Sequence, residues 1–301
     1  MKLSAIALVT GLIAFGAQAE QIEITHAQGT TTVEIQPKRV VVIGLGALDT
    51  VKEFGVEPVA ISTVSMFPEY LAEYRKGDYV SAGSLFEPDY ETIFTQKPDL
   101  IIVGARGASK YDELSEIAPT IVYAADSKQG YWASTQQQWR NLGKVFDKQD
   151  YVEQKIAQVD ADFKAIREYN QTNNVDALTV MSAGGNITAF GAKSRFASIY
   201  KDFGFKETVE GIKESRHGDL ISYEFIKDKN PSTLLIIDKD KLINKGKSTT
   251  ERDFENDLVK ATKAYQNKHM AYLDINAWYL SIAGMRATEQ MIDDVKSSLS
   301  M

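Results

Sequence analysis

Two side chains in this sequence stand out as candidate ligands for a hard metal ion. The chain has three histidines, and one, His217, lies in the polar segment Ser215-Arg216-His217-Gly218. Further along, Tyr279 follows Trp278 in an aromatic segment. A hard ion such as Fe³⁺ prefers anionic oxygen, which a phenol can supply, and accepts imidazole as a partner. On residue type alone, His217 is equally a polar loop residue and Tyr279 an aromatic packed beside Trp278.

The motifs of common enzymes are missing from the sequence. There is no Gly-x-Ser-x-Gly elbow, no His-Glu-x-x-His pair and no P-loop, and three histidines populate a general-base arrangement poorly. Gly44-Leu45-Gly46 resembles the start of a dinucleotide-binding turn, but Asp49 stands where a third glycine should allow close packing. The low number of histidines also disfavours a carrier of bare zinc or manganese. We therefore predict that the protein is not an enzyme.

Residues 1–19 have the pattern of a secretion signal. Met1-Lys2 is positive, residues 3–15 form an apolar run too short to span a bilayer, and Gly16-Ala17-Gln18-Ala19 ends in small residues. The sequence contains no cysteine, so it has no thiol for a lipid anchor, a disulfide or a thiolate metal site. We expect a soluble protein of the Gram-negative periplasm that is not lipid-anchored.

The composition limits the possible partners. The formal net charge is -7 and no basic stripe offsets it, which argues against nucleic acid binding. A hydrophobic content of 44% allows a large core, in one domain or in two lobes. An acidic average remains compatible with a small cationic pocket.

Strands and helices alternate along the first half of the chain. Apolar runs predict strands at 39–43, 58–61 and 100–103. Helices are expected at about 47–54 and 90–96, the second ending before a Lys-Pro-Asp break. This alternation is typical of a parallel α/β sheet.

The second half of the chain repeats this plan. Residues 90–102 are echoed by 223–237, with the same Tyr-to-Pro spacing, and Glu53-Phe54-Gly55-Val56 is echoed by Asp202-Phe203-Gly204-Phe205. Two copies of one plan favour two similar α/β lobes with parallel-type central sheets. Chance reuse of a common helix-Pro-strand pattern is the alternative.

One amphipathic helix is expected between the two lobes. Its apolar positions recur at helical spacing, namely Val152, Ile156, Val159, Phe163 and Ile166. A single helical connection predicts small hinge angles, and the cleft between lobes is the natural ligand site. The predicted division is a signal segment 1–19, an N-terminal lobe 20–149, a connecting helix 150–170 and a C-terminal lobe 171–301.

Several motifs, taken together, resemble one protein family. The general ones are Pro37-Lys38-Arg39-Val40-Val41, Pro88-Asp89-Tyr90-Glu91-Thr92-Ile93 and Lys97-Pro98-Asp99-Leu100-Ile101-Ile102. The more specific ones are Ser194-Arg195-Phe196, His217-Gly218, Ser222-Tyr223-Glu224-Phe225 with Asn230-Pro231, and Trp278-Tyr279-Leu280. Their order and spacing resemble the helical-backbone (class III) periplasmic binding proteins of ABC importers, and within them the catecholate siderophore branch.

The resemblance implies a carrier of ferric catecholate siderophores with no intrinsic cofactor. Two catechols fill four of the six positions around Fe³⁺, and similar carriers close the other two with a His and a Tyr, here His217 and Tyr279. A six-oxygen siderophore would saturate the metal and leave both side chains at the outer surface of the ligand. The alternatives are a carrier of another chelate, such as hydroxamate iron, haem or cobalamin, and an exported enzyme.

The resemblance also implies cationic positions around the anionic ligand. Two of them match Arg106 and Arg195, and the third falls on Lys239, where relatives commonly carry Arg. Lysine keeps the charge but lacks the planar fork for bidentate contact. Arg216 is a further candidate. Each of these residues alone could instead be a solvated surface cation.

Glu91 and Glu224 occupy equivalent places in the two repeats. In the family such carboxylates, one in each lobe, dock into basic pockets of the permease, where charge complementarity orients the encounter. Each could equally be a first-turn carboxylate that complements a helix dipole. We expect a monomer that delivers a ferric siderophore to the permease of an inner-membrane ABC importer.

Overall fold

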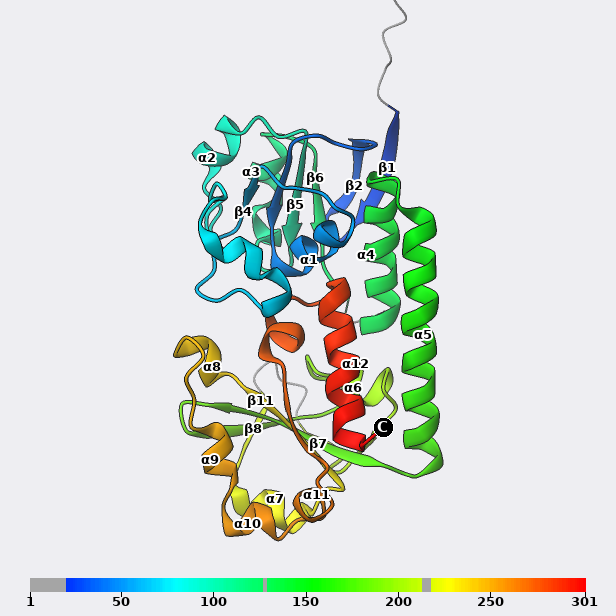
Figure 1. The fold of residues 1–301 in the computed structure, drawn as a ribbon, viewed down its shortest axis with the longest axis vertical. Helices are drawn as coiled ribbons and strands as arrows, with labels where there is room; N and C mark the ends of the chain where they lie inside the picture. The colour runs from blue at the N-terminus through cyan, green and yellow to red at the C-terminus, as the bar shows by residue number, and fades with distance from the viewer. Residues whose placement is uncertain (1–19, 127–128, 213–217) are drawn as a thin grey trace, which may run out of the picture.

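The computed structural model of the chain describes residues 20–126, 129–212 and 218–301. It consists of two α/β lobes stacked along the long axis and joined at one side by a long helix (Figure 1). The predicted signal segment lies outside the described residues. Within the described ranges, no helix has both the length and the apolar character that a membrane span requires.

The N-terminal lobe is built on a parallel sheet of order β4-β3-β5-β6. Both faces of this sheet are covered, which explains why β3 and β5 read as unbroken apolar runs. The strands predicted at 39–43 and 100–103 are confirmed to within one residue, while the one predicted at 58–61 begins later. The four strands are β3 (Val40–Ile43), β4 (Ala60–Ile61), β5 (Leu100–Gly104) and β6 (Thr120–Tyr123).

Helices and one hairpin complete this lobe. The antiparallel hairpin of β1 (Gln21–His26) and β2 (Gly29–Glu34) contacts β6 and α4. The helices predicted at 47–54 and 90–96 are confirmed as α1 and α2, within a residue or two at their ends. The helical elements are α1 (Leu45–Glu53), η1 (Glu69–Lys76), α2 (Tyr90–Thr95), η2 (Ala108–Lys110), α3 (Tyr111–Ser115) and α4 (Tyr131–Val145).

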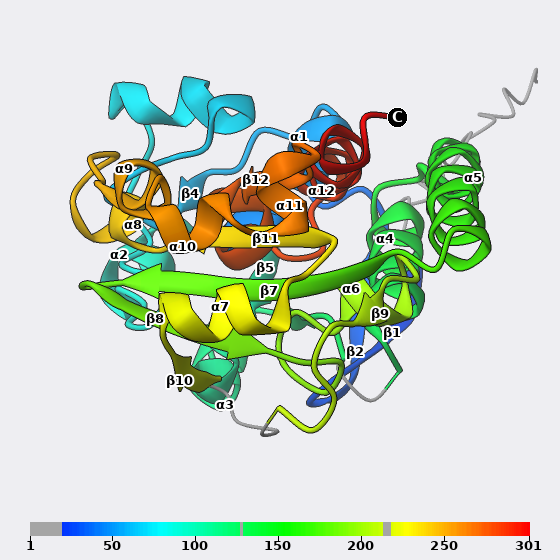
Figure 2. The same cartoon turned by 90° about the horizontal axis from the view of Figure 1, so that it is seen from below.

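The long helix α5 (Gln149–Thr172) runs beside both lobes (Figure 1). All five apolar positions of the predicted amphipathic face are buried. Seen from below, α5 lies at one side of the sheets, next to α4 (Figure 2). The helical spacing in the sequence therefore identified the face of α5 that packs on the core.

The C-terminal lobe has a six-stranded mixed sheet of order β10-β8-β7-β11-β12, with β9 paired to β7. β7, β11 and β12 are parallel, as predicted, but β8 and β10 add an antiparallel edge. Gly184 and Gly185 explain this edge, because both have positive φ and close a two-residue hairpin between β7 and β8. The strands are β7 (Asp176–Ala183), β8 (Asn186–Phe190), β9 (Lys206–Glu207), β10 (Asp219–Ile221), β11 (Thr233–Asp238) and β12 (Met270–Leu273).

Short helices cover this sheet. α7, α10 and α11 lie on the face that points away from the N-terminal lobe, in front of the sheet in the view from below (Figure 2). The helical elements of the lobe are α6 (Ser198–Lys201), α7 (Tyr223–Lys229), α8 (Asp240–Ile243), α9 (Thr250–Phe254), α10 (Asp257–Lys260), α11 (Lys263–Gln266), the π-helical turn η3 (Asn276–Leu280) and α12 (Met285–Leu299).

A single hydrophobic cluster extends through both lobes. It includes Val40 and Leu100 of the N-terminal sheet, and Leu235 and Ile237 of the C-terminal sheet. α12 takes part in the same cluster and contacts α1, α5 and β12. A shared core of this kind favours limited relative motion of the lobes, so the small hinge angle stays our prediction.

The sequence repeat extends to the backbone. Asp89 and Ser222 cap α2 and α7, each accepting a hydrogen bond from a first-turn N–H. After these helices, Lys97 and Asn230 adopt left-handed φ values of 48° and 49° immediately before a proline. Equivalent caps, left-handed residues and prolines therefore precede β5 and β11 in the two lobes.

Candidate functional site

Three cationic side chains surround one aromatic ring between the lobes. The ring is that of Tyr279, which is half-buried in η3. Arg195 Cζ lies 4.3 Å from the ring centroid, Arg106 Cζ 5.3 Å and Lys239 Nζ 6.0 Å. These distances lie within the range of cation–π attraction. The structure thus brings together four of the residues singled out in the sequence.

The sheets explain why these residues meet. Arg106 follows the carboxyl end of β5, and Lys239 follows that of β11. Residues after the carboxyl ends of parallel strands gather at one edge of a sheet, where α/β proteins commonly bind ligands. Arg195 lies between β8 and α6, and Tyr279 in a π-helical turn, a conformation frequent at functional sites.

The electrostatics of the site favour negative charge on the phenol. Burial raises the pKa of Tyr279, but the charge and hydrogen bond of Arg195 outweigh burial, helped by the charges of Lys239 and Arg106. The pKa of Tyr279 consequently lies below its ordinary value of 10.0. A phenol in this setting can give up its proton to become an anionic oxygen donor.

Arg106 has a further role in the structure. Its Nη2 donates to the carbonyl oxygen of Tyr279 at 2.7 Å, and its Nη1 donates to that of Leu280 at 3.4 Å. The guanidinium therefore holds the main chain that carries the phenol. No local pattern predicts this contact, because it joins two segments far apart along the chain.

Two of the expected site residues, His217 and Arg216, lie outside the described residues. Their predicted roles, metal ligation for His217 and ligand contact for Arg216, stay predictions. The described chain resumes at Gly218, whose φ is 72°. A Cβ at this position would stand 2.5 Å from the carbonyl oxygen of Ala189 in β8. Gly218 therefore allows a close approach to β8 that other residues would disturb.

Glu91 and Glu224 are exposed in the first turns of α2 and α7. A hydrogen bond from the Ser222 side chain lowers the pKa of Glu224, which keeps this carboxylate charged. Both lobes thus present an exposed carboxylate at an equivalent helix start. Docking by these two residues stays a prediction.

Several cavities lie on the N-terminal lobe, and two of them border the carboxyl ends of β3, β4 or β5. A small one, of about 120 Å³, is lined by Gly44, Gly46, Arg106, Leu280 and Ile282 among others. Its lining includes both the carboxyl ends of β3 and β5 and the chain after Tyr279. Space beside Arg106 is therefore available at the strand ends.

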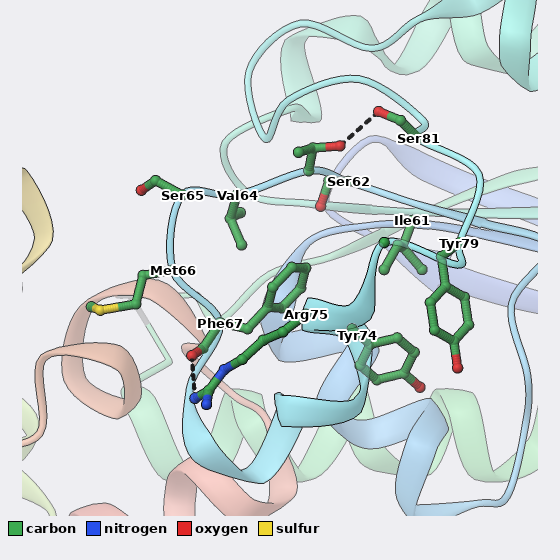
Figure 3. A pocket seen from close by; sticks show the side chains of 12 residues that line it. Ile61, Ser62, Val64, Ser65, Met66, Phe67, Tyr74, Arg75, Tyr79 and Ser81 are labelled. Atoms are coloured by element: carbon green, nitrogen blue, oxygen red, sulfur yellow. Dashed lines mark hydrogen bonds between the residues drawn. The ribbon is translucent and has the colours of Figure 1, made fainter. Parts of the chain in front are cut away.

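A larger cavity, of about 410 Å³, adjoins β4 and η1 (Figure 3). The hydroxyls of Ser62 and Tyr74 line it and are buried, and neither has a hydrogen-bond partner among the described residues. Arg75 also lines it but donates to the Phe67 carbonyl and pairs with Glu69. No sequence pattern predicts this cavity. Its other polar lining residues are Thr63, Ser65, Tyr79 and Ser81.

Sequence reasoning also missed the role of Asp49. The carboxylate accepts hydrogen bonds from the backbone N–H groups of Arg286 and Ala287, at the start of α12. The glycine-rich turn before α1 is thus a packing feature, in agreement with the rejection of the dinucleotide reading. No local pattern could have identified Asp49 as a cap, because α12 lies at the other end of the chain.

Comparison with known proteins identifies the family. Residues 40–277 match the periplasmic binding protein family, and the chain belongs to it. Its fold, two α/β lobes joined by a long helix, is that of the class III periplasmic binding proteins. The family consists of substrate-binding transport proteins.

Individual relatives narrow the comparison. The structure of the periplasmic catecholate-siderophore binding protein VctP of Vibrio cholerae is 62% identical, with TM-score 0.89, and covers 92% of this chain and 100% of that one. The petrobactin-binding protein YclQ of Bacillus subtilis is 37% identical, with TM-score 0.87 and coverage of 94% and 99%. The ferric-anguibactin-binding protein FatB of Vibrio anguillarum is 30% identical over 97% of this chain and 94% of FatB. Siderophore-binding proteins thus recur among the relatives.

Proposed function

We propose that this protein binds ferric complexes of catecholate siderophores and delivers them to an ABC importer. The observation that carries the proposal is the gathering of Arg106, Arg195 and Lys239 around Tyr279. The relatives named for catecholate, petrobactin and ferric-anguibactin binding support the same ligand class.

The chemistry of the ligand fits these side chains. Ferric catecholates carry several negative charges, and a cleft that excludes water must offset the loss of their hydration with charge-assisted hydrogen bonds. Arg195 and Lys239 can donate such bonds from the C-terminal lobe, and Arg106 adds positive charge from the N-terminal lobe. The acidic protein thereby keeps a local cationic site.

Tyr279 is proposed as a direct ligand of the metal. With a two-catechol siderophore, two adjacent positions on Fe³⁺ remain open, and the Tyr279 phenolate takes one while His217 takes the other. The lowered pKa of Tyr279 favours this step because less free energy is needed to remove the phenolic proton. A three-catechol siderophore fills the metal and needs neither side chain as a ligand.

The proposed setting is the periplasm of a Gram-negative cell. The protein acts there as a monomer and meets the permease in the inner membrane through Glu91 and Glu224, one on each lobe. The exposure of both carboxylates and the family membership support this proposal.

The test is a titration with mono-, bis- and tris-catecholate iron and with a neutral hydroxamate iron complex. Three tryptophans and fourteen tyrosines report binding by fluorescence quenching. Saturable quenching by the catecholates alone is expected. An equal response to the hydroxamate would contradict the charge argument and favour a carrier of other chelates.

Replacing Tyr279 by Phe tests the ligation. Bis-catecholate iron should bind about tenfold more weakly, the equivalent of about 1.4 kcal/mol, and its visible charge-transfer band should change. Tris-catecholate iron should be affected much less. The matched control is Tyr272→Phe in β12, an aromatic whose ring has no cation within cation–π distance among the described residues. An unchanged visible spectrum in Tyr279→Phe would exclude coordination by the phenolate.

A further inference from the structure

The segment from the end of η3 to the start of α12 belongs to the C-terminal part of the chain but is bound to the N-terminal lobe. Residues 279–287 run from the predicted metal ligand to the first turn of α12. Besides Arg106, which holds the carbonyls of Tyr279 and Leu280, three further N-terminal contacts secure this segment. They lie at Gly46, at the Ala283 carbonyl and at Asp49.

The first contact is a close approach of backbones. A Cβ on Gly46 in α1 would stand 2.2 Å from the carbonyl oxygen of Ile282. No real side chain tolerates that distance, so the segment lies directly on α1 because residue 46 is glycine. The main chain after Tyr279 is thus pressed against the N-terminal lobe.

The second contact holds a left-handed residue. Ala283 has φ 69° and is fully buried, and its carbonyl oxygen accepts two hydrogen bonds. Tyr123 Oη donates at 2.5 Å from β6, and Trp139 Nε1 donates at 2.7 Å from α4. A non-glycine residue in this conformation persists because the surrounding contacts hold it.

The third contact is the capping of α12 by Asp49. Its Oδ2 accepts from the Ala287 N–H at 2.9 Å and its Oδ1 from the Arg286 N–H at 3.3 Å. The carboxyl group is fully buried, and a Cβ on Gly284 would stand 2.2 Å from Oδ2. Asp49 therefore fixes where α12 begins and where the segment before it must run.

We infer that Asp49 is a positioning residue for the Tyr279 phenol. By binding residues 279–287 to the N-terminal lobe, Asp49 keeps the phenol in a fixed position relative to that lobe. This inference rests on the proposed function of Tyr279. When the lobes move, Tyr279 keeps its place relative to Arg106 and changes its place relative to Arg195 and Lys239. The site is thereby divided into an N-terminal half that carries the phenol and a C-terminal half that carries two cations.

The experiment compares Asp49→Ala with a matched control, Asp176→Ala. Asp176 also accepts a backbone hydrogen bond, from Ser232, but it begins β7 at the end of the sheet opposite Asp238. For Asp49→Ala we expect bis-catecholate iron to bind about tenfold more weakly, with a visible band displaced toward that of Tyr279→Phe. Tris-catecholate iron should bind with nearly unchanged affinity, and the control should leave both ligands unaffected.

A purely structural role would not distinguish the two ligands. Equal weakening of bis- and tris-catecholate binding in Asp49→Ala would therefore overturn the inference, and so would an unchanged visible band.

A second measurement does not depend on the ligand. Hydrogen exchange of residues 279–287 in the ligand-free protein should speed up about tenfold in Asp49→Ala, while β7 and β11 keep their rates. Unchanged exchange in the segment would overturn the inference. If the wild-type protein bound no ferric catecholate, the proposed function would fail, and the exchange rates would still decide whether Asp49 fastens the segment.

Discussion

The two lobes hold their cations beside Tyr279 in different ways. Arg106, from the N-terminal lobe, donates to two main-chain carbonyls of the segment that carries the ring. Arg195 and Lys239, from the C-terminal lobe, approach the ring itself. Within the described parts of the chain, no carbonyl or carboxylate oxygen accepts a hydrogen bond from either of these two side chains. The N-terminal cation is thus partly used by the fold, whereas the C-terminal ones keep most of their donors for a ligand, although Arg195 also hydrogen-bonds the Tyr279 phenol.

This difference shows how one site can combine precision with affinity. A phenol fixed by several contacts loses little conformational entropy when it binds a metal, because its position is already set. Cations without strong protein partners have their hydrogen-bonding capacity free for an anionic ligand. We therefore expect the geometry of ligation to depend on the N-terminal half, and the selection for anionic ligands to depend on the C-terminal half.

The strongest test of this division removes the two C-terminal cations. In Arg195→Gln/Lys239→Gln, binding of ferric catecholates should weaken about 100-fold or more, because each charge-assisted hydrogen bond contributes about 1.5–3 kcal/mol. The salt dependence of binding should fall as well. Fluorescence titration at low and high salt measures both effects. Lys263→Gln on the outer helix α11 is the control. Wild-type affinity in the double variant would show that Arg195 and Lys239 do not contribute to ligand binding.

The two lobes have different roles at the ligand site, but we expect them to contribute equally to docking on the permease. Reversing the exposed carboxylates in Glu91→Lys/Glu224→Lys should lower siderophore-dependent iron uptake by cells about tenfold, because like charges would meet the permease. Affinity for the ferric siderophore in solution should not change. Uptake assays and titration of the purified variant measure the two quantities, with Glu168→Lys on α5 as the control. Weakened solution binding would place these residues in the ligand site instead.

The contact of Asp49 with the start of α12 should depend on pH. Burial raises the pKa of Asp49 to about 7, with a further upward effect of Glu53, against the hydrogen bonds from Ala287 and Arg286. A carboxyl group with a raised pKa stabilises the fold fully below its unfolded pKa, and this contribution is lost as the pH rises through the folded pKa. The protonated form of Asp49 is therefore the more stabilising one.

Asp49→Asn removes this titration. The free energy of unfolding of the wild type minus that of Asp49→Asn should fall by roughly 2–3 kcal/mol between pH 5 and pH 8. Urea denaturation of both proteins at the two pH values measures the difference. Taking the difference cancels other titrating groups, such as Asp202 and Asp294, whose pKa values burial also raises. A constant difference across this range would show that Asp49 does not titrate there.

Local patterns in the sequence predicted most of the fold. The apolar runs of β3 and β5 and the helical spacing in α5 depend on burial of nearby residues, which sequence periodicity records directly. The antiparallel edge of β8 was missed, although Gly184-Gly185 between two apolar runs is a hairpin signal. The hairpin turn is a local signal, so this error was not caused by a long-range effect.

The site could be predicted only in part. Arg106, Arg195, Lys239 and Tyr279 came from resemblance to a family, and the structure places them together. The fastening by Asp49 had no local signature, because its partners in α12 are distant in the sequence and the pairing is decided by tertiary packing. The candidate ligand-binding residues were thus recognisable from motifs, whereas the contacts that hold them in place were not.

The smallest expected effect concerns the protonation of the Tyr279 phenol, which lies between the N-terminal and C-terminal halves of the site. Arg195 is the first of the groups that lower the pKa of Tyr279 against the effect of burial. Arg195→Gln should therefore raise that pKa, while Arg195→Lys should raise it less because the charge is kept. The ultraviolet absorbance of the phenolate, titrated against pH, measures the shift. Since the chain has fourteen tyrosines, each curve is taken as the difference from the same protein with Tyr279→Phe. A pKa that stays constant in Arg195→Gln would mean that Arg195 does not set the charge of the phenol and acts on the ligand only.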